Sequence, residues 1–141
     1  MLIPILLTAL IVASFWFIFE KAGRYGWRSL IPFYNIYTEY EIAWNTSKFW
    51  RTLIAGGAFY LCLIVVVFAE LADKEFLMFM ALFAAIGFLV WFAILSCKFW
   101  IRRARAFGRS DGFGWGLIFL PPIFLAILAF DDSEYYGPQY D

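Results

Sequence analysis

The chain has 141 residues, of which 65% are apolar and 23% aromatic. A soluble domain of this size has too little interior to bury so much apolar surface, so the composition excludes an ordinary soluble fold and favours a chain solvated by lipid. The formal net charge is zero and there is no histidine, the commonest metal ligand and general base. We therefore expect no metal, no cofactor and no nucleic-acid partner.

Four apolar stretches are long enough to cross the hydrocarbon core of a membrane as helices. They cover residues 1–19, 52–69, 76–97 and 112–130. The first lacks the preceding positive charges and the cleavage site of a secretory signal, so we expect it to be retained. The pattern predicts an all-α integral membrane protein with four helices, folded as a single transmembrane domain over residues 1–141.

The fourth stretch contains the pair Pro121-Pro122. Proline removes a backbone donor and breaks or kinks a helix. Membrane helices tolerate this where neighbouring groups satisfy the freed carbonyls. Two alternatives stay open at this point: a bent helix that crosses fully, and a re-entrant segment.

Basic residues are very unevenly distributed between the connections. Ten of the 11 lie between the first and second stretches or between the third and fourth, and only Lys74 lies elsewhere. Because positive charge is retained in the cytoplasm, both of these connections should be cytoplasmic. The distribution predicts a multi-pass membrane protein with extracytoplasmic N- and C-termini. The acidic, tyrosine-rich tail would then lie outside, with Tyr135 and Tyr136 in the outer aromatic belt.

The first connection, residues 20–48, is too apolar for a solvated loop. From Asn35 onward it carries an apolar and aromatic stripe at helical spacing, with Glu39 and Glu41 off the stripe; the stripe is Ile36, Tyr37, Tyr40, Ala43 and Trp44. We interpret it as an amphipathic helix in the plane of the interface. It either sets the depth of the spans or contacts lipid or a partner, for which the candidate residues are Trp27, Tyr34 and Tyr37.

The second connection carries Lys98, Arg102, Arg105 and Arg109 at spacings of four, three and four residues. On a helix these residues form one basic face, so the third span should run on for two or three turns beyond the membrane. Such a cluster attracts anionic lipid, at about 1 kcal/mol per charge. Simple control of topology explains the cluster equally well, and both interpretations stay open.

Gly112 and Gly116 have the GxxxG spacing that lets membrane helices approach closely, so they are candidates for helix packing. The surrounding glycines do not form a phosphate-binding loop, which needs a preceding strand and the pattern GxxxxGK[ST]. A tight turn before the fourth stretch is the simpler interpretation.

No charged residue lies in the middle of any span, so the usual signs of a proton relay or an ion path are missing. The serines within the spans, Ser14 and Ser96, have no predictable catalytic partner. Cys62 and Cys97 lie in apolar runs and are expected to be free packing thiols. The sequence therefore predicts that the protein is not an enzyme.

Several short motifs resemble an uncharacterised family of small bacterial membrane proteins. They are Phe19-Glu20-Lys21-Ala22-Gly23 with Gly26-Trp27, Ile31-Pro32-Phe33-Tyr34-Asn35 with Tyr37, Ala106-Phe107-Gly108-Arg109, Gly112-Phe113-Gly114 with Gly116-Leu117, Phe119-Leu120-Pro121 and Phe124, and Leu128, Phe130 and Tyr136-Gly137-Pro138. In that family the domain occurs alone and ahead of some signal peptidase I catalytic domains, which implies a membrane module that supports other machinery. This chain carries no catalytic domain, and Leu53-Ile54-Ala55-Gly56-Gly57 stands where the family usually has a second Ile-Pro-x-x-Asn element.

The leading hypothesis is a non-catalytic accessory or scaffolding subunit of a larger membrane protein complex, with other membrane subunits and lipids as partners. The alternative is a stand-alone protein that binds anionic lipids through its basic cytoplasmic face. A membrane enzyme or channel would need polar groups within the spans, which the sequence lacks. A pigment or lipid bound along the phenylalanine-rich helices would leave no motif.

Overall fold

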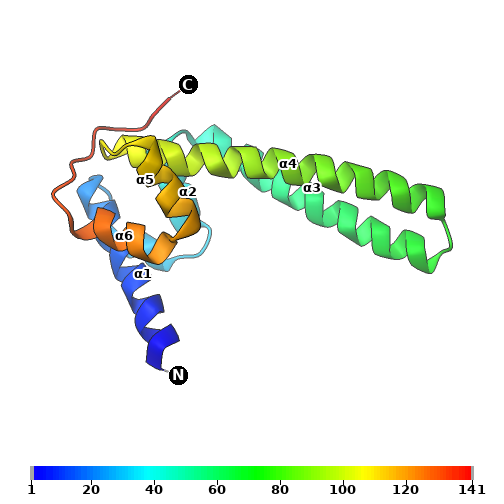
Figure 1. Ribbon diagram of the computed structural model, residues 1–141, viewed down its shortest axis with the longest axis horizontal. Helices are drawn as coiled ribbons and strands as arrows, with labels where there is room; N and C mark the ends of the chain where they lie inside the picture. Colours follow the sequence, from blue (N-terminus) through cyan, green and yellow to red (C-terminus); the bar gives the residue numbers. More distant parts are fainter. Residues whose placement is uncertain (1, 141) are drawn as a thin grey trace. The chain divides into compact units, whose positions relative to one another are not determined.

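The computed structural model describes residues 2–140, and within this range the chain forms helices and no strands (Figure 1). The elements in chain order are α1 (Leu2–Lys21), the 3-10 helix η1 (Gly26–Leu30), α2 (Tyr34–Ala43), α3 (Thr46–Leu71), α4 (Glu75–Ala106), α5 (Asp111–Phe119) and α6 (Pro121–Phe130). The predicted all-α class is confirmed.

Three helices, α1, α3 and α4, are long and apolar enough to cross a membrane. The stretch 112–130 is not one helix, because it divides into α5, with nine residues, and α6, with ten. At 1.5 Å per residue each reaches only about 14–15 Å, roughly half of the 30 Å hydrocarbon core. The helix α4 continues to Ala106, which confirms that the third stretch extends helically for more than two turns beyond residue 97.

The chain divides into two compact units. Unit 1 contains residues 2–46 and 97–140, and unit 2 contains residues 47–96. The division does not follow helix boundaries, because α4 contributes its first part to unit 2 and its last part to unit 1. The single transmembrane domain over residues 1–141 stays a prediction.

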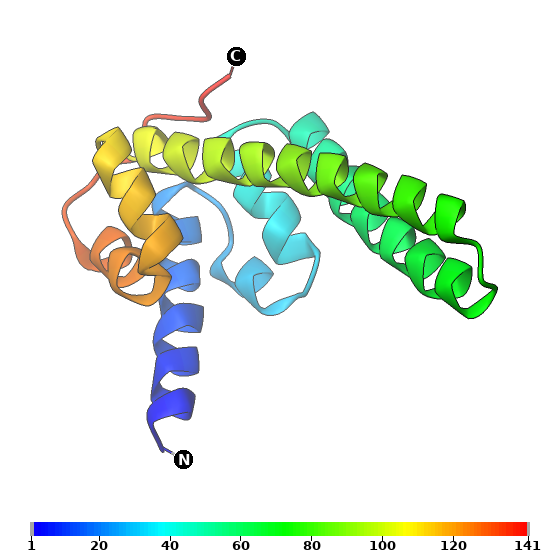
Figure 2. The same cartoon turned by 45° about the vertical axis from the view of Figure 1, so that its right-hand side comes forward.

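Unit 1 has a shared apolar core. Its buried residues come from α1, α2, α4, α5 and α6: Ile18, Phe19, Ala22, Ile42, Ala104, Ala106, Phe107, Leu117, Leu125, Leu128 and Ala129. Helix α6 packs along the C-terminal half of α1, and η1 contacts α1 as well (Figure 2). The first three turns of α1 contribute nothing to this core, since residues 2–10 are all exposed.

The break between α5 and α6 follows from the two prolines. Leu120 precedes Pro121 and has φ −133° and ψ 58°, outside the helical region, as expected for a residue before proline. Pro121 and Pro122 then occupy the first turn of α6, where a helix has no use for their missing N–H groups. The prolines thus end one helix and start another.

A second turn in unit 1 lies between η1 and α2. Phe33 has φ 64°, a rare conformation for a bulky residue, and the Asn35 side chain donates to the Ser29 carbonyl across the turn, at 3.1 Å. Helix α2 buries Tyr40 and Ala43 of the predicted stripe but leaves Ile36 half exposed. Glu39, which the stripe leaves on the polar side, is buried with them.

Unit 2 is a hairpin of the first part of α4 and most of α3, joined by a turn in which Lys74 N–H bonds the Ala69 carbonyl at 2.9 Å. Few of its side chains are buried, and most of these are small: Phe49, Thr52, Ala55, Ala69, Ala81, Ala85 and Leu95. Most of its large apolar side chains are exposed, including Phe76 and Phe83 at 80% or more. Cys62 in unit 2 and Cys97 in unit 1 are free thiols, as predicted.

Candidate functional site

The charged residues of unit 1 gather where several helices end. Helices α2, α4 and α6 all leave C-terminal carbonyls that have no partner within their own helix. These carbonyls also form the negative ends of the helix dipoles, which favour nearby cations and N–H donors. We call the C-terminal ends of α2, α4 and α6, together with Lys21 and the tail 131–140, the polar end of unit 1.

Lys21, the last residue of α1, caps the end of α6. Its Nζ donates to the carbonyls of Leu128 and Asp131, each at 2.7 Å, and lies 3.1 Å from Asp131 Oδ1. Arg109 Nη2 bonds the other carboxylate oxygen of Asp131. Burial works against ionisation of Asp131, but Ser133, Lys21 and Arg109 donate to its carboxylate and hold its pKa below the usual range. Asp131 therefore joins the ends of α1 and α6 to Arg109, two residues before α5.

Glu39 of α2 and Arg103 of α4 form a buried ion pair. Arg103 is only 1% exposed, and its guanidinium carbon lies 5.2 Å from the Phe15 ring centre and 5.3 Å from that of Trp100. Burial raises the pKa of Glu39 to about 7, although the Arg103 charge opposes this. A buried pair of this kind is costly to desolvate and strongly destabilising to break, so it fixes α2 against α4.

The C-terminal tail lies across the ends of α2 and α4. The Tyr135 hydroxyl donates to the Ile42 carbonyl at 2.7 Å, and burial raises the pKa of Tyr135 to about 12. Tyr136 N–H bonds the last residue of α4, Ala106, at 2.8 Å. Gln139 N–H bonds the last residue of α2, Ala43, at 3.1 Å. The tail thus supplies donors to carbonyls that the helices leave open.

The predicted basic face is partly neutralised within the chain. Arg105 makes two bonds of 2.6 Å to Asp111, Arg109 pairs with Asp131, and Arg102 donates to the Gln139 carbonyl at 2.5 Å. Arg102 also lies 4.7 Å from the Trp44 ring centre, whereas Lys98 is exposed. The buried arginine, Arg103, does not belong to the basic face that the sequence predicted.

The three aromatic residues predicted to contact lipid or a partner form a row on the η1–α2 segment. The ring centres of Trp27 and Tyr34 are 6.0 Å apart, and those of Tyr34 and Tyr37 are 6.5 Å apart and stacked. Arg28 lies 5.1 Å from the Tyr34 ring centre and also pairs with Glu41. The structure therefore brings these three aromatics together.

The predicted glycines have different surroundings. A Cβ added at Gly116 would lie 2.3 Å from the Phe124 ring, so Gly116 makes room for α6 to fold against α5. A Cβ at Gly112 would meet only the Ser110 hydroxyl, at 3.7 Å. The close backbone approach is at Gly114, where a Cβ would lie 2.7 Å from Ile101 Cα on α4. Gly112 and Gly116 each lie two residues from Gly114, so the GxxxG pair does not make this contact.

Two open clefts adjoin the polar end. One, of about 630 Å³, lies beside Trp44, Tyr135 and Tyr140, and the other, of about 430 Å³, beside Arg109, Asp132 and Tyr136. Within residues 2–140, no three metal-ligating side chains come together. What the arrangement does physically is tie four helices and the tail into one unit through ion pairs and capped carbonyls.

The sequence profile of a family of unknown function, DUF5684, matches residues 27–138. The chain belongs to this family. The match includes the segments that build the polar end except α1 and the last residues of the tail, from Gln139 on. No curated protein and no solved structure is significantly similar to the chain.

Sequence reasoning missed four residues of the polar end: Glu39, Arg103, Lys21 as a helix cap, and Asp131. Each is paired with a residue far away along the chain; Lys21 and Asp131, for example, are 110 positions apart. The one local signal was that Glu39 precedes Tyr40 and lies three and four positions before Ile42 and Ala43, which are all buried. A charge beside a buried helix face predicts a buried partner, but not which one.

Proposed function

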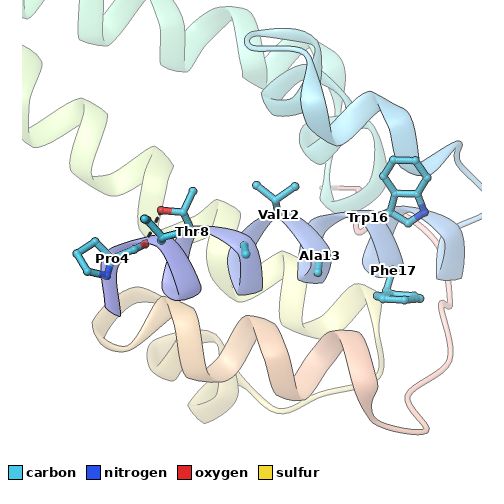
Figure 3. Close-up of a pocket in the computed structure, with 8 residues that line it drawn as sticks. Pro4, Thr8, Val12, Ala13, Trp16 and Phe17 are labelled. Carbon is cyan, nitrogen blue, oxygen red and sulfur yellow. Dashed lines mark hydrogen bonds between the residues drawn. The ribbon is translucent and has the colours of Figure 1, made fainter. Parts of the chain in front are cut away.

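We propose that this protein is a non-catalytic accessory or scaffolding subunit of a larger protein complex in the bacterial cytoplasmic membrane. The observation that carries the proposal is one apolar face of α1, whose residues 2–10 are all exposed. Along this face runs an open apolar groove of about 760 Å³, lined by Pro4, Ile5, Thr8, Ala9, Val12, Ala13, Trp16 and Phe17 (Figure 3).

The groove suits a second transmembrane helix. Lipid is as apolar as a helix surface, so membrane helices associate by close packing at small residues. Ala9 and Ala13 supply small residues one turn apart, and the Thr8 hydroxyl is already bonded to the Pro4 carbonyl at 2.8 Å (Figure 3). The floor of the groove is therefore apolar and shallow, and a partner helix would pack there without leaving a polar group unpaired.

The internal ion pairs favour this role over that of a lipid-binding protein. Arg105 and Arg109 are both bonded to carboxylates of the same chain. An anionic headgroup would have to compete with those carboxylates. The positive-inside distribution further supports an extracytoplasmic N-terminus, which would place the groove in the outer half of the membrane.

Purification of the tagged protein in mild detergent, followed by mass spectrometry, tests the proposal. We expect a defined set of membrane proteins at fixed ratio, lost in the variant Ala9→Phe, which fills the groove. The control is Leu7→Phe, on the opposite face of α1 and outside the groove lining, which should keep the partners. A lone protein that carries only anionic lipid would overturn the proposal in favour of lipid binding.

A further inference from the structure

We infer that residues 111–130 enter and leave the membrane from one side, as a re-entrant helical hairpin whose tip lies in the hydrocarbon. The C-terminal tail then lies on the same side as Lys21. This inference concerns the topology of unit 1 and does not depend on whether the protein has a partner.

The first argument is the position of the two ends of the hairpin. Arg109 lies two residues before α5, Asp131 directly follows α6, and their side chains form an ion pair. If α5 and α6 crossed the membrane in sequence, these residues would lie about 30 Å apart on opposite surfaces. Lys21, at the end of α1, bonds the same Asp131, so all three charges belong to one surface.

The second argument is the tail. Tyr136 bonds the end of α4 and Gln139 the end of α2. Both helix ends lie within the connections that hold ten of the 11 basic residues. The tail therefore lies among the residues that the charge distribution places in the cytoplasm.

The third argument is the chemistry of the tip. Its side chains are apolar and at least half exposed, with Phe119 at 73%, Leu120 at 52% and Ile123 at 55%. Backbone groups within hydrocarbon must be satisfied inside the protein. Leu120 N–H bonds the Gly116 carbonyl at 2.8 Å, and Pro121 and Pro122 have no N–H to satisfy. The turn thus leaves no N–H group of residues 120–122 without a partner.

The charge distribution permits this topology. The positive-inside rule counts lysine and arginine, and acidic residues contribute little to it. Moving the acidic tail to the cytoplasmic side leaves the basic residues where they were, and it supplies Asp131 to Lys21 and Arg109. The N- and C-termini then lie on opposite sides, which replaces the expectation from sequence that both are extracytoplasmic.

Single cysteines test the inference, in a background with Cys62→Ala and Cys97→Ala. The probes are Tyr140→Cys in the tail, Tyr25→Cys in the first connection and Lys74→Cys in the α3–α4 turn, all at exposed positions. They are labelled with a membrane-impermeant maleimide in spheroplasts and in inside-out vesicles. We expect Tyr140→Cys to be labelled in the same preparation as Tyr25→Cys. Labelling of Tyr140→Cys together with Lys74→Cys would overturn the inference.

A second measurement tests directly whether the two ends of the hairpin lie close together. The pair Arg109→Cys and Asp131→Cys is treated with a short bismaleimide in native membranes, and Lys74→Cys with Asp131→Cys is the control. We expect an intramolecular cross-link in the first pair, seen by intact mass, and none in the second. If both cysteines of the first pair react with maleimide but never cross-link, the segment crosses the membrane and the inference fails.

Discussion

The two units differ in how they bury or expose their apolar side chains. Unit 2 is a hairpin of two long helices whose large side chains mostly face outward, and its contacts follow from one turn at residues 72–74. Unit 1 is made of shorter pieces held by a common core, ion pairs and capped helix ends. The difference teaches that long apolar helices need few internal contacts, whereas broken helices need polar groups to join their ends.

The largest expected effect comes from breaking the buried pair in unit 1. Arg103→Leu leaves the Glu39 carboxylate buried without its partner, and we expect a loss of about 3–5 kcal/mol of stability. Arg51→Leu, at an exposed arginine of unit 2, should stay within about 0.5 kcal/mol. Thermal unfolding in one detergent compares the two variants. Equal midpoints would show that the pair does not hold unit 1, and Glu39→Met added to Arg103→Leu should recover part of the loss.

The pH dependence sharpens the same comparison. Burial raises the pKa of folded Glu39 to about 7 from an ordinary value of 4.5, so the folded state holds this proton more tightly than the unfolded state does. The resulting stability is complete below pH 4.5 and is lost as the pH rises through 7. We expect Arg103→Leu to lose more stability at pH 8 than at pH 5, measured by unfolding midpoints at both. The same loss at both would contradict this role of Glu39.

Glycine substitutions should give the next largest difference in stability between the two units. Gly114→Ala in unit 1 places a Cβ 2.7 Å from Ile101 Cα, and overpacking of this kind costs about 1–3 kcal/mol. Gly57→Ala in unit 2 meets nothing within 4 Å and should be neutral or stabilising by up to about 1 kcal/mol. Unfolding midpoints of the two variants should move in opposite directions. A stabilised Gly114→Ala would show that α4 and α5 are not in close contact.

The smallest expected effect is at the tail. Tyr135→Phe removes the hydrogen bond to the Ile42 carbonyl and should cost about 0.5–1.5 kcal/mol. Tyr140→Phe, at a side chain that is 68% exposed, is the matched control and should change little. Limited proteolysis of the tail, alongside the unfolding midpoint, reports whether residues 131–140 are released. Equal proteolysis of both variants would mean that Tyr135 does not hold the tail.

Sequence reasoning located the apolar parts of α1, α3 and α4, because each is a long apolar run that is helical for local reasons. Helix α1 agrees within two residues, whereas α3 begins six residues before the predicted span and α4 ends nine residues after it. Sequence reasoning also predicted the helical extension after Cys97. The contact of Trp27, Tyr34 and Tyr37 with lipid or a partner stays a prediction. The sequence left open whether the prolines bend or end a helix. Composition cannot decide this, because the answer depends on a tertiary contact. Helix α6 packs against α5 only if the Phe124 ring fits against Gly116.

The sequence by itself determined that this is an all-helical chain suited to a membrane, with basic residues segregated to two connections, because length, hydropathy and charge are properties of local stretches. Only the tertiary structure decided which charges are paired. Lys21, Glu39, Arg103 and Asp131 meet partners from distant elements. Their pairing depends on how α5 and α6 fold back against α1, and no spacing along the chain encodes that geometry.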